Sequence, residues 1–286
     1  MNPTVVGIGE LLWDVFPNEK KAGGAPINFV YHASQLGSEG YAISAVGNDV
    51  FGTEILQVLE KNHIRHCIET VEHPTGNVLV ELDNKGKPTY TIVEGVAWDY
   101  IPLTQGAIDL VKRADAVCFG TLAQRATVSR ETITALLNYA PAASLRFFDI
   151  NIRQHFYTKE LIEACLQKAN VFKINDEELE LICQMFDLKG STDEICRLFI
   201  EKYALRYMIL TAGSDFSTIY TASEQSTIQT PKVTVADTVG AGDAFSGAFV
   251  HSILNGKPLR EAHQTAVDIA AYVCTKQGAW PPYPNK

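Results

Sequence analysis

Short apolar runs alternate with amphipathic stretches along most of the chain. The apolar runs predict buried strands at residues 4–9, 41–46, 116–120, 145–150, 171–174 and 207–210. Between them, apolar residues recur at helical spacing and predict helices at 26–36, 51–61, 130–139, 159–168, 176–185 and 193–202. This alternation predicts an α/β fold in which helices cover both faces of a central, mostly parallel sheet.

Two segments interrupt the alternation. Residues 77–82 and 89–93 have the character of strands and flank the turn-rich run Asp83-Asn-Lys-Gly86, which predicts a β-hairpin. Residues 216–220 and 226–229 predict a second hairpin. The chain then returns to helix at 240–254 and 259–276, and the proline-rich run that starts at Trp280 predicts an irregular tail.

Composition narrows the class of protein. The 286 residues are 46% hydrophobic and 20% charged, as in a folded globular enzyme. A net charge of -9 argues against a nucleic-acid binder, which needs a basic face, although local backbone amides can still bind a small anion. No apolar run approaches the length of a membrane span, so we expect no membrane partner and a cytoplasmic protein. The six cysteines form no C-x-x-C pair, which indicates buried thiols rather than a metal or redox motif.

The run Asp237-Thr-Val-Gly-Ala-Gly-Asp-Ala-Phe-Ser-Gly247 carries the strongest chemical signal. Gly240 and Gly242 allow the backbone to approach a ligand closely, and the helix that follows directs unpaired N–H groups at the same place. Asp243 lies in the first turn, where a carboxylate could accept a hydroxyl proton. A capped helix start would explain an isolated Gly-x-Gly-Asp, but the longer run before an apolar helix favours phosphoryl transfer to an alcohol.

Four ordered motifs together resemble one family. Besides the run at 237–247, they are Gly23-Gly-Ala-Pro-Ile-Asn28, Val46-Gly-Asn-Asp-Val-Phe-Gly52 and Asn175-Asp-Glu-Glu178. They resemble the motifs of the PfkB, or ribokinase-like, carbohydrate kinases. The resemblance implies ATP-dependent phosphorylation of a sugar hydroxyl by a single Rossmann-like α/β domain, residues 1–286. It also implies a small β-sheet lid formed by about 11–24 and 76–94, through which members often form homodimers.

The family pattern also implies a sugar site and a reaction centre. The residues that match sugar contacts are Asp14, Gly24 and Asn28, and a carboxylate such as Asp14 can accept bonds from two adjacent hydroxyls. Gly240, Ala241, Gly242 and Asp243 match the anion hole and the base. Arg153 follows a strand end in Asp149-Ile-Asn-Ile-Arg153, where ligands bind in open α/β sheets; it either contacts sugar or phosphate, or is a surface arginine.

The nucleotide side is implied by further matches. Thr211 and Gly213 resemble the nucleotide-binding Thr-x-Gly turn, together with Gly240 and Gly242. Phe216 stands where the family often has a second glycine, so we expect a different shape of the adenine and ribose pocket. Asn175 and Glu178 match the residues that organise Mg²⁺ through water, although a plain helix cap would explain them in isolation. Asp237 and Thr238 resemble a monovalent-cation loop, which makes K⁺ a further candidate cofactor.

Two loops resemble those of bacterial fructokinases. They are the run from Glu10 to Pro17 and Gly95-Val-Ala-Trp-Asp99. This resemblance favours D-fructose, phosphorylated at its 6-hydroxyl, with ribose and 2-keto-3-deoxygluconate as alternative substrates. Trp13 and Trp98 either wall the sugar site or belong to the core.

Three other classes of protein lack support in the sequence. A dinucleotide-dependent dehydrogenase is disfavoured because Gly7-Ile-Gly9 is followed by Leu12 where the third glycine belongs. A P-loop NTPase is excluded, since Gly-x-x-x-x-Gly-Lys-Ser/Thr does not occur. A sugar-binding regulator without catalysis is a further alternative, but such a protein should have lost the base or the anion hole.

Overall fold

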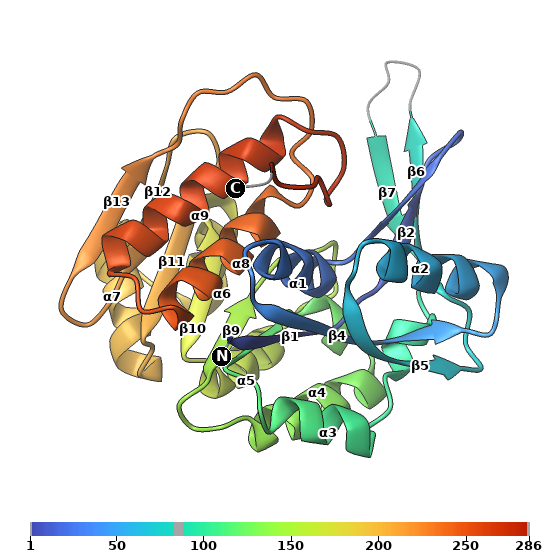
Figure 1. Cartoon of the computed structure of the whole chain (residues 1–286). Helices are drawn as coiled ribbons and strands as arrows, with labels where there is room; N and C mark the ends of the chain where they lie inside the picture. The colour runs from blue at the N-terminus through green and yellow to red at the C-terminus, as the bar shows by residue number, and fades with distance from the viewer. Residues whose placement is uncertain (1, 83–87, 285–286) are drawn as a thin grey trace.

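A large sheet forms the centre of the molecule (Figure 1). The computed structural model describes residues 2–82 and 88–284. In the described chain, seven neighbouring strands of this sheet are parallel, and β12 (Phe216–Tyr220) and β13 (Gln225–Gln229) continue it as an antiparallel hairpin. The parallel strands, in spatial order, are β11 (Tyr207–Ala212), β10 (Val171–Asn175), β9 (Leu145–Asp149), β8 (Ala116–Phe119), β1 (Thr4–Ile8), β4 (Glu39–Gly47) and β5 (Arg65–Val71).

A second, smaller sheet projects from the body beside the ends of these strands (Figure 1). Its order is β3 (Lys20–Gly23), β2 (Leu12–Val15), β6 (Gly76–Leu82) and β7 (Pro88–Ile92). The antiparallel pair of β6 and β7 confirms the hairpin expected from the sequence, whereas its expected turn at 83–86 lies outside the described residues. All four strands fall within the two segments that the family pattern assigns to a lid.

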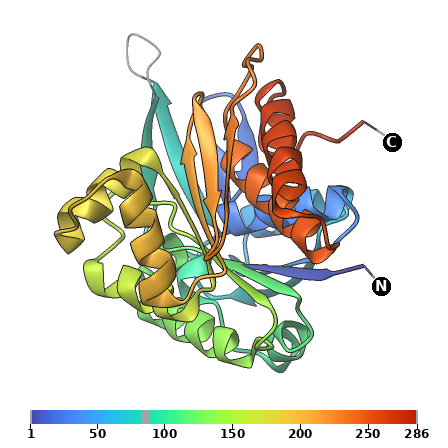
Figure 2. The same ribbon diagram turned by 90° about the vertical axis from the view of Figure 1, so that its left-hand side faces the viewer.

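Helices cover both faces of the large sheet (Figure 2). One layer contains α1 (Ala25–Gln35), α2 (Val50–Lys61), α8 (Ala241–Leu254) and α9 (Leu259–Cys274). The opposite layer contains α3 (Gln105–Val111), α4 (Thr127–Tyr139), α5 (Lys159–Lys168), α6 (Asp176–Phe186) and α7 (Thr192–Tyr203). Two short 3₁₀ helices, η1 (Ala97–Tyr100) and η2 (Leu122–Gln124), lie between β7 and α4. The predicted α/β architecture is therefore confirmed.

Local chemistry sets where the helices that border the site begin. Pro26 occupies the first turn of α1, where its missing N–H costs no helical hydrogen bond. At α6, Asn175 and Glu178 form a reciprocal capping box. The start of α8 depends on Gly240, whose φ of 78° lies in the left-handed region; a Cβ there would also lie 2.9 Å from Cβ of Ala279.

The order of the strands creates a crevice. From β1 the chain runs outward to β4 and β5, then returns to β8 on the other side of β1 and continues to β11. Ligands of open α/β sheets bind beyond the carboxyl ends of the strands at such a reversal.

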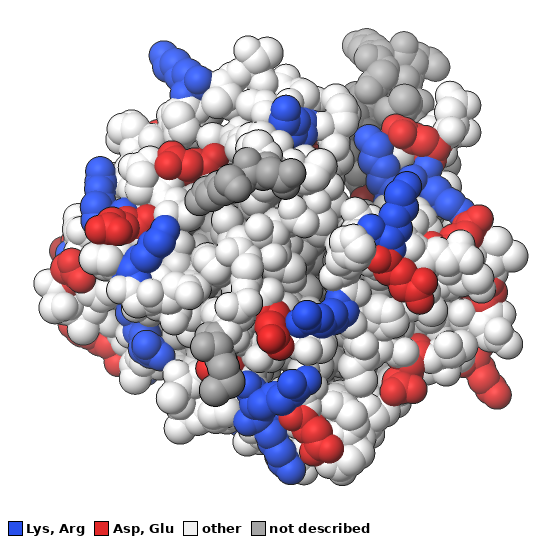
Figure 3. All heavy atoms as spheres, in the orientation of Figure 1, with Lys and Arg blue, Asp and Glu red and all other residues white. Residues whose placement is uncertain are grey.

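Charged side chains of both signs are spread over the face of the molecule that Figure 3 shows. On this face, Lys and Arg side chains are interspersed with Asp and Glu side chains rather than gathered in one basic patch. Within the described residues, no helix combines the length and the apolar character that crossing a membrane requires.

Candidate active site

A cavity of about 720 Å³ lies where the crevice meets the small sheet and the start of α8. Most residues expected to form the site line it: Asp14, Gly24, Asn28, Arg153, Asn175, Glu178, Thr211, Thr238, Gly240, Gly242 and Asp243. Ala241 and Asp237 lie next to lining residues in the chain, and Gly213 lies two residues after the lining residue Thr211, but none of the three is part of the lining. Positions that are far apart in the sequence therefore converge on one cavity.

Asp243 is held at the start of α8 by a side chain from α1. Asn28 Nδ2 donates a hydrogen bond to Asp243 Oδ2 over 2.7 Å. Burial raises the pKa of Asp243 to about 6, and the negative charge of Asp149 adds to this effect, while Lys173 and the bond from Asn28 oppose it. The carboxylate is thus a stronger base than an exposed aspartate and is still ionised at neutral pH.

A buried ion pair lies beneath Asp243. Lys173, in the middle of β10, donates to Asp149 Oδ2 at the end of β9 over 2.7 Å, and both side chains are about 10% exposed. Burial alone would lower the pKa of Lys173, but the charge and hydrogen bond of Asp149 outweigh it and raise the pKa. The ammonium group lies beside the glycine turn, because a Cβ on Gly242 would be 3.4 Å from Nζ of Lys173. A fixed positive charge therefore faces the start of α8.

The capping box of α6 places a carboxylate at the cavity wall. Glu178 Oε1 accepts from the backbone of Ile152 over 2.8 Å, and Oε2 accepts from the backbone of Asn175 over 2.9 Å. In return, Asn175 Oδ1 accepts from the backbone of Glu178 over 2.8 Å. Burial raises the pKa of Glu178, and the charge of Asp149 contributes to the rise. Each carboxylate oxygen keeps lone-pair capacity for a further donor, such as a water molecule.

The side of the cavity next to the small sheet also carries carboxyl groups. Asp14 comes from β2, and burial raises its pKa to about 6 although Arg153 and Lys21 oppose the shift. Glu10 follows β1 and is 3% exposed; its Oε1 accepts from the backbone of Ala25 over 3.2 Å. The exposed side chain of Arg153 lines the same cavity, which favours a ligand contact over a plain surface arginine.

The expected nucleotide turn connects β11 to β12. Thr211 is part of β11, and Gly213 has a φ of 46° in the turn. Phe216 pairs with Ala212 as the first residue of β12. The second glycine of the family pattern is thus replaced by a strand residue, and the turn closes through a bond of 2.8 Å from the backbone of Asp215 to the carbonyl of Ala212.

The loop expected to bind a monovalent cation is already well bonded. Asp237 Oδ1 accepts from the backbone of Val239 over 3.1 Å, and Oδ2 accepts from the backbone of Gly278 over 3.0 Å. Over the ranges 2–82 and 88–284, no group of three or more His, Cys, Asp or Glu side chains is arranged to hold a metal ion. A cation here would need backbone carbonyls or water as its other ligands.

The two tryptophans considered for the sugar wall lie outside the cavity lining. Trp13 is 4% exposed, and its Nε1 donates to the carbonyl of Phe51 over 3.0 Å. Trp98 is fully buried below the guanidinium of Arg125, whose central carbon is 3.9 Å from the ring centroid. The sequence left open whether these tryptophans wall the sugar site or belong to the core. Both are core aromatics.

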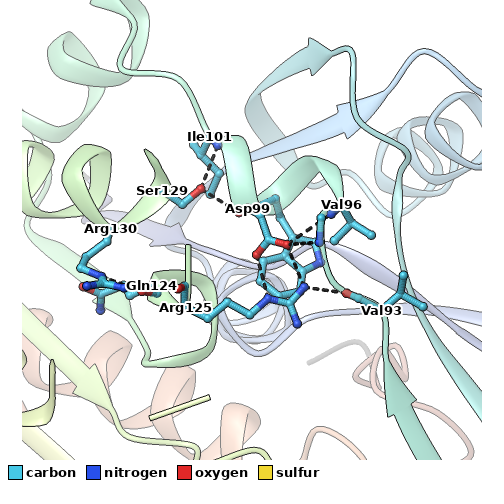
Figure 4. Close-up of polar contacts among 10 residues, drawn as sticks. Val93, Val96, Asp99, Ile101, Gln124, Arg125, Ser129 and Arg130 are labelled. Carbon is cyan, nitrogen blue, oxygen red and sulfur yellow. Dashed lines mark hydrogen bonds and ion pairs between the residues drawn. The ribbon is translucent and has the colours of Figure 1, made fainter. Parts of the chain in front are cut away.

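A buried ion pair fastens the small sheet to the body (Figure 4). Arg125 donates from Nε and Nη2 to the two oxygens of Asp99 over 2.8 and 2.9 Å, and Nη2 also donates to the carbonyl of Val93 over 2.6 Å. Asp99 also accepts from the backbones of Gly95 and Val96. The pair thus fixes the segment that leads from β7 back to the large sheet.

Comparisons with known proteins decide the family. Residues 7–286 match the description "pfkB family carbohydrate kinase". The chain belongs to this family. The pfkB chain is therefore a sugar kinase, a phosphotransferase that uses ATP, which removes the dehydrogenase alternative.

The relatives of this pfkB kinase include several sugar kinases. A fructokinase of Salmonella typhimurium is 30% identical over 278 residues, which are 90% of this chain and 87% of that protein. The crystal structure of an uncharacterised sugar kinase of Pyrococcus horikoshii is 28% identical, covers 97% of this chain and 93% of that chain, and has a TM-score of 0.82. A fructokinase of Vibrio cholerae, solved with fructose, ADP and a calcium ion, is 22% identical, covers 99% and 96% of the two chains, and supports the fold with a TM-score of 0.82.

Some residues of the site were not expected from the sequence. Lys173 had one signal, since it is a charged residue between the apolar residues Phe172 and Ile174 of a strand. Glu10 had a similar signal, because it follows an apolar run directly. Gln154 lines the cavity and donates to the carbonyl of Tyr90 in β7 over 2.8 Å. The sequence held no signal for this residue, because the contact joins residues 64 positions apart.

Proposed function

We propose that this sugar kinase transfers the γ-phosphoryl group of ATP to the 6-hydroxyl of D-fructose and so forms fructose 6-phosphate. The observation that carries the reaction is the position of Asp243. It is held by Asn28 at the start of α8, between the sugar side of the cavity and the glycine turn. A base and an anion site are thus next to each other, as transfer to an alcohol requires.

In this proposal Asp243 takes the hydroxyl proton as the sugar oxygen attacks the γ-phosphorus. A pKa raised to about 6 by burial suits this task, because the base is ionised at neutral pH and binds a proton more strongly than an exposed aspartate. The backbone N–H groups of Gly242 and Asp243 lie in the first turn of α8, where they have no partner within the helix. They are the donors that stabilise the charge developing on the transferred group, with Ala241 completing the turn.

The residues on the nucleotide side fit ATP and a divalent cation. We assign Thr211 and Gly213 to the nucleotide, and Gly240 and Gly242 to its phosphates. Glu178 and Asn175 fit Mg²⁺ held through water, because both residues line the cavity and the oxygens of Glu178 keep lone pairs beyond the two backbone bonds. Bound Mg²⁺ would neutralise charge on the phosphate oxygens. K⁺ beside Asp237 and Thr238 is a further candidate.

The sugar side fits a polyol. Asp14, Gly24 and Asn28 line it together with Arg153, and a carboxylate such as Asp14 can accept from two neighbouring hydroxyls. We propose that the small sheet closes over the sugar as a lid, which excludes water and limits hydrolysis of ATP. We also propose that it forms the contact of a homodimer. The choice of fructose rests on the fructokinase relatives and on the two loops that resemble theirs.

Substitution of the base tests the mechanism. For Asp243→Asn we expect turnover to fall by about two to four orders of magnitude with sugar binding largely kept, because only the proton acceptor is removed. The measurement is release of ADP in a coupled assay, with calorimetry for sugar binding. Near-normal turnover of the variant would show that another group accepts the proton.

A panel of acceptors tests the substrate. The wild-type kinase is assayed with fructose, ribose, 2-keto-3-deoxygluconate, tagatose phosphate and nucleosides, and we expect the highest kcat/KM with fructose. A preference for another member of the panel would keep the sugar kinase and reject fructose. Sugar binding without turnover on any acceptor would favour a regulator that has lost catalysis.

A further inference from the structure

The C-terminal segment after α9 returns to the site along α1. The Trp280 ring stacks on Tyr31 with the centroids 5.9 Å apart, and the Tyr283 hydroxyl is 2.7 Å from Nδ1 of the buried His32. Ala279 packs against Gly240, at the turn that precedes Asp243. The segment that the sequence marks only as an irregular tail is thus fixed against two elements of the active site.

One hydrogen bond from this segment reaches the base through a single residue. Trp280 Nε1 donates to Asn28 Oδ1 over 2.7 Å, and Asn28 Nδ2 donates to Asp243 Oδ2 over the same distance. Asn28 is 5% exposed, and each end of its side-chain amide already has a protein partner. An indole N–H can only donate, whereas an amide can present either its oxygen or its nitrogen. The indole therefore selects the orientation in which the amide nitrogen faces Asp243.

We propose that Trp280 is a positioning residue: its indole N–H fixes the side-chain amide of Asn28 so that Asn28 donates to Asp243 and keeps this carboxylate ready to accept the sugar proton. This role rests on the proposed function of Asp243 as the base. Without the indole N–H, the amide can turn over and present its oxygen to Asp243. That arrangement favours the protonated carboxyl, which then donates the bond, and the base is lost over part of the pH range.

Other groups that face Asp243 must be kept constant in a test. They come from five neighbouring segments: Asp149 on β9, Lys173 on β10, Arg153 in the loop after β9, Glu10 after β1 and Cys118 on β8. Trp280→Phe changes none of these groups. It also keeps an aromatic ring for the stack on Tyr31, so the N–H donor is the main loss.

Kinetics as a function of pH test the proposal. For Trp280→Phe we expect the acid limb of kcat/KM to move up by about one pH unit, so that kcat/KM falls about tenfold at low pH and returns toward the wild-type value at high pH. A merely structural loss would lower activity equally at every pH. The control is Tyr283→Phe, which removes the hydrogen bond between the Tyr283 hydroxyl and His32 of α1 and leaves the bond from Trp280 to Asn28 in place; the acid limb of this variant should not move. An unmoved limb in Trp280→Phe, or an equal movement in both variants, overturns the proposal.

Nuclear magnetic resonance supplies a readout that does not require turnover. The chain has three tryptophans, so the indole resonance of Trp280 is assigned by its loss in Trp280→Phe. We expect this resonance to titrate with Asp243 in the wild-type protein and to stop titrating in Asp243→Asn. A resonance that ignores the ionisation of Asp243 overturns the link between the two residues. Retained turnover in Asp243→Asn would instead contradict the assignment of the base while leaving the link intact.

Discussion

Carboxyl groups that are withdrawn from water gather at the ends of the parallel strands, and Glu10 is the most deeply buried of those near Asp243. Its Oε1 accepts from the backbone of Ala25, whereas no bond reaches its buried Oε2 in the described part of the chain. Burial raises the pKa of Glu10 to about 7, and the charge of Asp243 adds to the rise. At moderately acidic pH the protein therefore holds a proton at the floor of its active site.

The proton on Glu10 should make the stability difference between the wild-type protein and Glu10→Gln depend on pH. In the unfolded chain Glu10 loses its proton near its ordinary pKa of 4.5, but in the folded protein it does so only near 7. As the pH rises from about 4.5 to 7, the wild-type protein should lose up to about 3 kcal/mol of stability relative to Glu10→Gln, and the difference should be constant above 7. Urea unfolding of both proteins at a series of pH values measures it. Parallel stability curves would mean that Glu10 ionises normally.

At the same scale, the sequence could predict residues that belong to a dense local motif. Asp243, Gly240 and Gly242 belong to one run, and all three line one cavity, while their roles stay predictions. Lys173 and Trp280 could not be assigned, because their partners are 24 and 252 residues away in the chain. A contact with such a distant partner cannot be predicted from the sequence around either residue.

At the scale of elements, the contact between α1 and α8 aligns the base with its partner. Gly247 lies one turn after Asp243, so both residues occupy the same side of α8. A Cβ on Gly247 would lie 2.7 Å from the carbonyl oxygen of Phe29 and 3.0 Å from the backbone nitrogen of Ala33. The absence of a side chain therefore lets α1 bring Asn28 within hydrogen-bonding distance of Asp243.

Gly247→Ala should separate the two helices. We expect a loss of stability of about 1–3 kcal/mol from overpacking and a fall in kcat/KM of about tenfold or more, as Asn28 moves away from Asp243. Thermal unfolding and steady-state kinetics measure these effects. The control is Gly106→Ala in α3, where the new Cβ would have its nearest contact at 3.5 Å and the higher helix propensity of alanine should stabilise the protein slightly. A Gly247→Ala enzyme with normal stability and kcat/KM would exclude the proposed steric role.

The elements themselves were predictable where their burial is uniform. The strands β8 to β11 are apolar runs because both of their faces are covered, and each was expected within a residue or two. β5 was not expected, since it is an edge strand in which the exposed Arg65 and the partly exposed His66 and Glu69 break the apolar pattern. The seven-residue helix α3 was missed because it is too short to show a clear period.

At the scale of the whole molecule, the shape of the cavity depends on a fixed position of the small sheet relative to the large sheet. The sequence predicted both hairpins, but it could not show that Asp99 and Arg125 join the small sheet to the body, because this contact exists only once the end of β7, η1 and the end of η2 have come together. The side chains of Asp99 and Arg125 are only 3% and 6% exposed. Such a pair is sensitive to the loss of either partner, since the remaining charge is left buried and unpaired.

Asp99→Asn should therefore destabilise the protein by about 3–5 kcal/mol, because the charge of Arg125 would stay buried without its counterion. Adding Arg125→Met removes this charge, so the double variant should recover part of the loss. Chemical denaturation measures both effects. The matched control is Asp193→Asn on α7, which breaks the exposed ion pair with Arg197, at 3.0 Å, and should cost less than about 1 kcal/mol. If Asp99→Asn lowers the free energy of unfolding no more than Asp193→Asn does, the buried pair does not hold the sheets together. A loss of several kcal/mol, together with weaker sugar binding by the folded variant, would show that the attachment of the small sheet and the shape of the cavity are coupled.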